Sequence, residues 1–301
     1  MPVLLDDDDV RARLSATDAV RWMGEAVDAH HRGDLVAPPR IQAKLGEGRL
    51  TFTAGRLRGS WFGYRSYDSL PGEPGSQVVV VHDDGTGEVR AVSIGTELGR
   101  RRTGAIGGVA AAALAPPEAA VVAVIGAGDQ AYTQVWALAA VRRLADVRVY
   151  SRRPAHRDAF ATAIAALTGA ECRAVSDPRR AVDGAEIVVL ATSSPTPVIE
   201  AAWLPPRCYV ATLGAKQQGR AEFGLDLPAA AGLLVTDSRP QISAYDPPNL
   251  LVGTGHEERL VPLGAVRAGE VPAASDGITV FFSVGLAGTE VFLLHRLVGG
   301  A

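Results

Sequence analysis

Two glycines in the middle of the chain follow a buried strand and precede a helix, where they could hold a dinucleotide. The sequence VVAVIGAGDQA places Gly126, Gly128 and Ala131 directly after an apolar run. In such a turn the first glycine permits the bend, the second lets the backbone approach a pyrophosphate, and the third position keeps helix and strand close. The diphosphate then meets free N–H groups at the helix N-terminus. The predicted cofactor contacts in this turn are Gly126, Ala127, Gly128, Asp129 and Gln130.

The end of the next strand distinguishes the two nicotinamide cofactors. NAD enzymes place an acid there to bind the ribose 2′-hydroxyl, whereas a 2′-phosphate is repelled by a carboxylate and attracted by arginine. Here the strand 147–150 continues into Ser151, Arg152 and Arg153. These residues predict NADP(H); the alternative is a pair of solvated arginines in a chain with only two lysines among its 30 basic residues. The predicted cofactor-binding set also includes Thr192, Leu213 and Val284.

Apolar strands that alternate with helices surround this turn and predict a Rossmann-type parallel sheet covered on both faces. The fold class is therefore α/β, and this domain is expected over residues 105–276. The expected strands are 120–125, 147–150, 172–175, 187–191, 209–213 and 233–236, and the expected helices are 130–143, 155–168 and 178–182.

The residues before this domain predict a second, α+β domain with an antiparallel sheet. Apolar residues at helical spacing predict a helix over 14–31, and a small-residue helix is expected over 103–114. The expected strands are 50–54, 61–64, 78–82 and 89–94. The tail 279–297 is predicted as one hydrophobic helix that packs back on this domain, which would then comprise residues 1–104 and 277–301.

Composition narrows the classes of function. The 301 residues are 47% hydrophobic and 21% charged, with a net charge of −3. This balance excludes disorder and disfavours nucleic-acid binding, so a small-molecule ligand is expected. No apolar run reaches the roughly 18 to 20 residues of a membrane span, and the start MPVLLDDDDV is acidic where a signal peptide would be basic. We expect a cytoplasmic protein with no metal site, two free core thiols (Cys172 and Cys208) and a solvated acidic N-terminus at residues 6–9.

Several segments in order and spacing resemble the ornithine cyclodeaminase/mu-crystallin family across nearly the whole chain. The matching pieces are Pro39-Arg40, Arg102-Thr103-Gly104-Ala105, Gly126-Ala-Gly128-Asp-Gln130-Ala131, Val235-Thr-Asp237-Ser238 and Asp276-Gly-Ile-Thr279-Val-Phe281-Phe-Ser283-Val-Gly285. The resemblance implies a homodimer whose first domain supplies the dimer sheet and the substrate pocket. It also implies that Arg40 and Arg102 bind the substrate carboxylate, which suits the planar guanidinium fork.

Two positions depart from the family pattern. A family lysine corresponds to Arg65, and arginine stays protonated, so it cannot carry protons as a lysine can. The cyclodeaminase's catalytic aspartate corresponds to Lys216, which would repel the distal ammonium of ornithine. Two alternatives stay open at this point: Lys216 could point to solvent from its loop, and a slip in the alignment would let Glu222 supply the carboxylate.

The resemblance and these departures together predict the activity. We expect Arg40, Arg65, Arg102 and Lys216 to serve an NADPH-dependent oxidoreductase that reduces the C=N bond of an imine (ketimine) bearing an α-carboxylate. The product would be an amino or imino acid. The alternatives are an ornithine or lysine cyclodeaminase, an amino-acid dehydrogenase, and a catalytically inactive NADP-binding protein.

Overall fold

The computed structural model describes residues 1–71, 75–274 and 276–299, which form two compact units. The first unit comprises Met1–Arg102 and Gly285–Ala301, and the second comprises Thr103–Val284. The chain therefore returns to its first unit at the C-terminal end, as the hydrophobic tail predicts. The return occurs after Val284, eight residues later than the predicted boundary at residue 277.

The first unit is built on a seven-stranded sheet with the order β1-β7-β6-β5-β4-β2, to which β3 adds by pairing with β4. All neighbouring strands are antiparallel except β1 and β7, so the predicted antiparallel sheet is confirmed. The helices are α1 (Asp7–Arg13), α2 (Ala16–His31), α10 (Thr289–Leu297) and the start of α3 (Glu97–Leu114). The strands are β1 (Val3–Leu5), β2 (Leu35–Val36), β3 (Ile41–Leu45), β4 (Gly48–Leu57), β5 (Trp61–Asp68), β6 (Gln77–Asp83) and β7 (Val89–Gly95).

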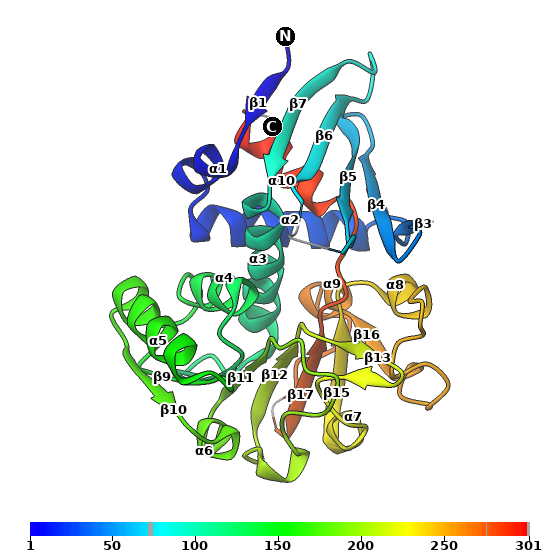
Figure 1. The fold of residues 1–301 in the computed structure, drawn as a ribbon. Helices are drawn as coiled ribbons and strands as arrows, with labels where there is room; N and C mark the ends of the chain where they lie inside the picture. Colours follow the sequence, from blue (N-terminus) through cyan, green and yellow to red (C-terminus); the bar gives the residue numbers. More distant parts are fainter. Residues whose placement is uncertain (72–74, 275, 300–301) are drawn as a thin grey trace. The chain divides into compact units, whose positions relative to one another are not determined.

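Helix α10 packs on β5, β6, β7 and α2 (Figure 1), and two glycines of the sheet let it approach closely. A Cβ on Gly55 would lie 2.5 Å from the Cα of Gly288, and one on Gly63 would lie 2.6 Å from a methyl group of Val291. Real Cβ atoms do not approach so closely, since protein interiors are tightly packed. The small residues therefore set the height of α10 above β5, and with it the position of Glu290.

The acidic N-terminus is not simply solvated, which corrects the prediction for residues 6–9. Asp6 is the N-cap of α1 and accepts hydrogen bonds from the backbone N–H groups of Asp8 and Asp9. Asp7 accepts hydrogen bonds from the backbone N–H groups of Thr96 and Glu97, each at 2.8 Å. Carboxylates at these places satisfy N–H groups that a helix start leaves without intrahelical partners.

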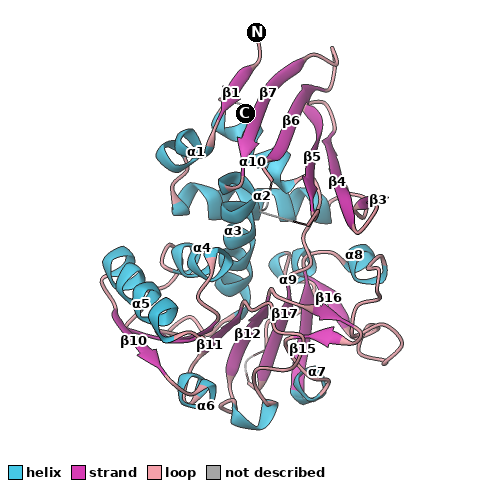
Figure 2. Cartoon of the chain, in the orientation of Figure 1, coloured by secondary structure: helices cyan, strands magenta, loops and turns pink. Residues whose placement is uncertain are grey.

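The second unit holds a parallel sheet, as the sequence predicts, but it has eight strands and not the six expected, in the order β10-β9-β8-β11-β12-β17-β15-β16. Its strands are β8 (Val121–Ile125), β9 (Asp146–Tyr150), β10 (Glu171–Val175), β11 (Ile187–Leu190), β12 (Cys208–Thr212), β15 (Ala231–Thr236), β16 (Leu260–Pro262) and β17 (Ile278–Phe282), with a hairpin of β13 (Lys216–Gln217) and β14 (Arg220–Ala221) beside them. The helices are α4 (Asp129–Leu138), α5 (Pro154–Thr168), α6 (Pro178–Val182), α7 (Asp226–Ala230), α8 (Arg239–Ser243) and α9 (Leu263–Arg267). Figure 2 shows α4 and α5 on one face of the sheet and α6 and α7 on the other.

The tail is the one long element that was predicted wrongly. Residues 278–282 form β17, which pairs with β12 and β15, and only Thr289–Leu297 are helical. Every residue of β17 is buried, and four of the five are apolar, so the segment does not reveal by periodicity whether it is strand or helix. Gly285 and Gly288 have positive φ angles of 93° and 76°, which separate the strand from the helix.

The two cysteines are free, as predicted, but only Cys208 lies in the core, so the prediction of a core position is wrong for Cys172. Cys208 is buried at the start of β12, and burial raises the pKa of its thiol to about 12. Cys172 lies half-buried on β10. Within the described residues, no helix is long and apolar enough to cross a membrane.

Candidate functional site

A buried carboxylate, Glu290 of α10, gathers two of the predicted arginines in the first unit. One of its oxygens, Oε1, accepts hydrogen bonds from Arg102 Nε at 2.8 Å, from Arg102 Nη2 and from Arg65 Nη1. The Glu290 side chain is 1% exposed, and those of Arg102 and Arg65 are 8% and 11% exposed. We call Arg40, Arg65, Arg102 and Glu290 the arginine cluster.

The charge of Glu290 is set by these neighbours. Burial alone would raise the pKa of its carboxyl group, but the positive charges of Arg102 and Arg65 outweigh burial and hold the pKa at about 2. Glu290 is therefore ionised at neutral pH. It pairs with the guanidinium groups of Arg65 and Arg102, so its single negative charge is outnumbered by two positive charges, and this arrangement suits a further anion.

Arg65 is held on every side of its guanidinium group. Its Nε and Nη2 donate to Gln77 Oε1 at 3.0 and 2.7 Å, its Nη1 donates to Glu290, and its Cζ lies 4.3 Å from the centre of the Tyr67 ring. A fixed cation of this kind contributes charge and order but transfers no proton.

Arg40 and Arg102 converge beside Gly285. Arg40 Nη2 and Arg102 Nη1 each lie 3.6 Å from the place that a Cβ on Gly285 would take. Arg40 Nη1 also donates to the Tyr67 hydroxyl at 3.5 Å. Two guanidinium groups directed at one point can bind a carboxylate with paired hydrogen bonds. The structure therefore brings together Arg40, Arg65 and Arg102, the three arginines predicted to serve the substrate.

In the second unit the Gly-rich turn follows β8 and meets the end of β11. Gly126 has a φ of 117°, and a Cβ there would lie 2.2 Å from the carbonyl oxygen of Ala191, so only glycine fits. Gly128 is the N-cap of α4 without a side-chain cap, and a Cβ there would meet nothing within 4 Å. Strand order reverses between β8 and β11, which is where open parallel sheets bind ligands. The turn thus offers open space beside a helix N-terminus, as a pyrophosphate requires.

The end of β9 carries positive charge next to this turn. Gly126 N–H donates to the carbonyl oxygen of Tyr150, the last residue of β9. Arg152 and Arg153 are exposed, and neither forms an ion pair with any described residue. Arg157 of α5 donates to the carbonyl oxygen of Ser151 at 3.2 Å and so braces the turn after the strand.

A second buried carboxylate, Glu222, ties together the ends of β11 and β12. Its Oε2 accepts from the backbone N–H and the hydroxyl of Thr192 at 2.7 and 2.9 Å, and its Oε1 accepts from the N–H groups of Leu213 and Gly214. Burial raises the pKa of Glu222, against the opposing effects of these hydrogen bonds and of Lys216. Because both oxygens are engaged by this chain, the structure disfavours the alternative that Glu222 receives a substrate ammonium.

Lys216 is buried beside Glu222 and does not extend into solvent. The residue is only 5% exposed. Its Nζ donates hydrogen bonds to the carbonyl oxygen of Leu213, at 3.0 Å, and to that of Ser283. These carbonyls follow β12 and β17, so the lysine links two neighbouring strand ends. Val284, which follows Ser283, donates its backbone N–H to Oδ1 of Asp237 at 2.8 Å. Thr192, Leu213 and Val284 therefore all lie at the carboxyl edge of the sheet.

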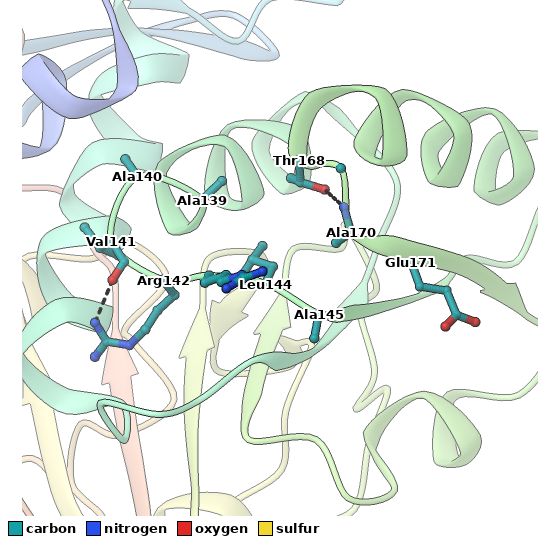
Figure 3. Close-up of a pocket in the computed structure, with 11 residues that line it drawn as sticks. Ala139, Ala140, Val141, Arg142, Leu144, Ala145, Thr168, Ala170 and Glu171 are labelled. Atoms are coloured by element: carbon teal, nitrogen blue, oxygen red, sulfur yellow. Dashed lines mark hydrogen bonds between the residues drawn. The ribbon is translucent and has the colours of Figure 1, made fainter.

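A separate hollow of about 680 Å³ lies at the opposite edge, where β9 and β10 begin (Figure 3). Arg142, which lines this hollow, donates hydrogen bonds to the carbonyl oxygens of Ala111 and Ala115 and so caps the end of α3. Dinucleotides bind at the carboxyl edge of such sheets. This hollow is therefore no candidate for the cofactor.

The sequence model of the ornithine cyclodeaminase/mu-crystallin family matches residues 2–298. The chain belongs to this family. It is 27% identical to an alanine dehydrogenase of Archaeoglobus fulgidus, over 96% of this chain and 92% of that protein. It is 29% identical to the ketimine reductase mu-crystallin of Rattus norvegicus, over 90% of this chain and 81% of that protein. Among solved structures, an archaeal alanine dehydrogenase dimer with bound NAD superposes with a TM-score of 0.88 at 25% identity, covering 99% of this chain and 94% of that one.

Two residues of this family member's site were not assigned from the sequence. Glu290 is an acid directly before the apolar run 291–294, a pattern that signals a buried and paired charge. Glu222 was considered only as a substitute for the cyclodeaminase aspartate, because its spacing from Lys216 does not reveal that strand ends converge on it. Both carboxylates hold other parts of the site in place.

Proposed function

We propose that this protein is an NADPH-dependent reductase of imines that carry an α-carboxylate. The observation that carries the proposal is the convergence of Arg40 and Arg102 beside Gly285, backed by Arg65 and the ionised Glu290. Two guanidinium forks hold a carboxylate in one orientation and so place the carbon next to it. The excess of positive charge favours an anionic substrate over a diamine.

The second unit fits a nicotinamide dinucleotide. The open side of Gly128 and the N-terminus of α4 suit the pyrophosphate, and Thr192, Leu213 and Val284 line the same edge of the sheet. Arg152 and Arg153 suit a 2′-phosphate, and the end of β9 offers no acid for a free 2′-hydroxyl. When bound, the reduced nicotinamide supplies a hydride to the imine carbon.

The relatives support an oxidoreductase of this kind. They include a ketimine reductase and alanine dehydrogenase, and alanine carries its nitrogen and its carboxylate on one carbon. A cyclodeaminase is disfavoured because the buried Lys216 would repel a distal ammonium and both oxygens of Glu222 are engaged. The proposal is tested against two alternatives, an inactive dinucleotide-binding protein and an amino-acid dehydrogenase.

The test is the oxidation of NADPH in the presence of a small panel of imines. The panel contains five- and six-membered cyclic imine carboxylates, keto acid–amine pairs, and a five-membered cyclic imine that lacks the carboxylate. We expect turnover of the carboxylates, with kcat/KM lower by on the order of 10²-fold when the carboxylate is absent, because charged hydrogen bonds contribute about 1.5–3 kcal/mol each. NADPH binding without turnover of any imine would instead identify an inactive binder.

We also propose that the first unit forms a homodimer through its sheet. Large apolar side chains are exposed on strands β1, β7 and β5 of one sheet, including Leu4 at 67%, Ile94 at 50% and Phe62 at 36% exposed. Apolar surface of this kind marks an interaction site. The archaeal alanine dehydrogenase structure, which is a dimer, supports a second copy of this chain as the partner.

A further inference from the structure

Reduction of an uncharged imine needs a proton as well as a hydride. The hydride forms a C–H bond at the imine carbon, the C=N π pair moves to nitrogen, and nitrogen must then receive a proton. Arg40, Arg65 and Arg102 stay protonated, and arginine does not release its proton in proteins. Glu290, whose pKa is held at about 2, carries no proton at neutral pH. None of the four members of the arginine cluster can therefore supply the proton.

Tyr67 brings a transferable proton to the same cluster. It lies on β5 two residues after Arg65, so both side chains leave the same face of the strand. Arg40 Nη1 donates to the Tyr67 hydroxyl oxygen at 3.5 Å, and the Arg65 guanidinium lies over its ring at 4.3 Å. A hydroxyl that accepts through a lone pair keeps its own hydrogen for donation. No acceptor for that hydrogen is found among the described residues.

The surroundings of Tyr67 also suit the phenolate that proton transfer would leave. Arg40 and Arg65 place two positive charges against this side chain, one at the oxygen and one over the ring. Positive charges that are already in place stabilise a negative charge as it develops, without reorganisation. Arg65 is itself fixed by Gln77 and Glu290, so it stays in position while the charge appears.

We propose that Tyr67 is the general acid that protonates the imine nitrogen, an inference that rests on the proposed function. The O–H bond of Tyr67 breaks as the new N–H bond forms, while the hydride adds to carbon. The products are the amine and a phenolate, and the phenolate regains its proton from water after the reaction. The substrate class is thereby narrowed to imines that arrive uncharged at nitrogen, with an adjacent carboxylate bound by Arg40 and Arg102.

The test compares an uncharged imine with one whose nitrogen carries a permanent charge. Tyr67→Phe and the wild type are assayed with a cyclic imine carboxylate and with its N-methyl iminium counterpart, at a pH where the unmethylated imine is uncharged. The N-methyl compound needs no proton. Tyr64→Phe is the matched control, because it removes a hydroxyl from the same strand at an exposed position on the opposite face.

We expect Tyr67→Phe to lower kcat/KM for the uncharged imine by on the order of 10²-fold or more, the usual contribution of a general acid. For the N-methyl iminium the loss should stay within about threefold, and Tyr64→Phe should behave as the wild type with both. Equal losses with both substrates would mean that Tyr67 only positions Arg40, and no loss with either would mean that water supplies the proton. Either result overturns the proposal. A wild type that reduces neither substrate would instead contradict the proposed function.

Binding of a non-reducible carboxylate provides a readout that does not depend on turnover. The affinity of the saturated cyclic amino acid for the NADP⁺-bound protein, measured by titration calorimetry, should change little in Tyr67→Phe. A loss that matches the fall in kcat/KM would assign Tyr67 to carboxylate binding and overturn its role as an acid.

Discussion

Replacement of Glu290 by glutamine tests whether one buried carboxylate organises the arginine cluster. Glu290 Oε1 accepts hydrogen bonds from both Arg65 and Arg102, and none of the three side chains is more than 11% exposed. Glutamine keeps the size of the side chain but leaves two buried guanidinium groups without the negative charge. Removal of one partner from a buried ion pair typically costs about 3–5 kcal/mol. We expect a loss of this size in the free energy of unfolding at pH 7.

The pH dependence of that loss follows from the pKa of Glu290. The folded protein lowers the pKa from 4.5 to about 2, which corresponds to about 3 kcal/mol of stability. A lowered carboxyl pKa contributes stability that is fully present above the unfolded value and is lost as the pH falls through the folded value. The difference between wild type and Glu290→Gln should therefore be nearly constant above about pH 5 and shrink by about 2 kcal/mol by pH 3.

The assay is urea unfolding of both proteins at one fixed protein concentration, at pH 7, 5, 4 and 3. Glu25→Gln is the control. Glu25 pairs with Arg296, which lies on α10 like Glu290, but the Glu25 side chain is 37% exposed. An exposed pair contributes less than about 1 kcal/mol, so the control should stay near the wild type. A Glu290→Gln variant that is as stable as the wild type, or a difference that does not change with pH, would refute the reasoning.

Four further results are expected. Joint replacement of Arg152 and Arg153 by alanine should weaken NADPH binding by about tenfold to a hundredfold and leave NADH nearly unchanged, because only a 2′-phosphate needs these charges; equal losses in fluorescence titrations would contradict this. Arg102→Ala should lower kcat/KM for an imine carboxylate by on the order of 10²-fold or more, and near-normal turnover would exclude its role in carboxylate binding. The unmodified protein should form neither proline nor ammonia from L-ornithine with NAD⁺ or NADP⁺, since the buried charge of Lys216 opposes a distal ammonium; proline in the product mixture would favour a cyclodeaminase. Ile94→Arg should convert a dimer to a monomer in sedimentation, since a charge buried in an apolar interface is costly, and an unchanged mass would place the interface elsewhere.

Local sequence patterns were enough to predict the elements that show regular spacing of apolar residues or are bounded by turn-forming residues. The Gly-rich turn was found because Gly126 and Gly128 stand between an apolar run and a helical pattern, and both conform to that prediction. The sheet of the first unit was found because its strands are short and separated by turn residues. For β17 the sequence predicts helix wrongly, because its residues show no alternation of polar and apolar types that would mark a strand.

Side-chain partners far apart in the chain could not be predicted in the same way. Arg102 and Glu290 are separated by 188 positions, and only the return of the chain to the first unit brings them together. The same holds for Glu222, whose partners Thr192 and Gly214 follow different strands. For Lys216, the sequence indicated an unusual position but not its hydrogen bonds to two carbonyl groups. The identity of a residue was therefore easier to predict than the group it contacts.

The most direct test of the reductase proposal is to follow the hydride itself. The protein is incubated with a cyclic imine carboxylate and NADPH that carries deuterium at both positions of nicotinamide C4, and the product is examined by mass spectrometry and NMR. We expect one deuterium per product molecule, bonded to the carbon that bears both the nitrogen and the carboxylate. A product without deuterium, a label at any other carbon, or no product while the protein binds NADPH would contradict the account.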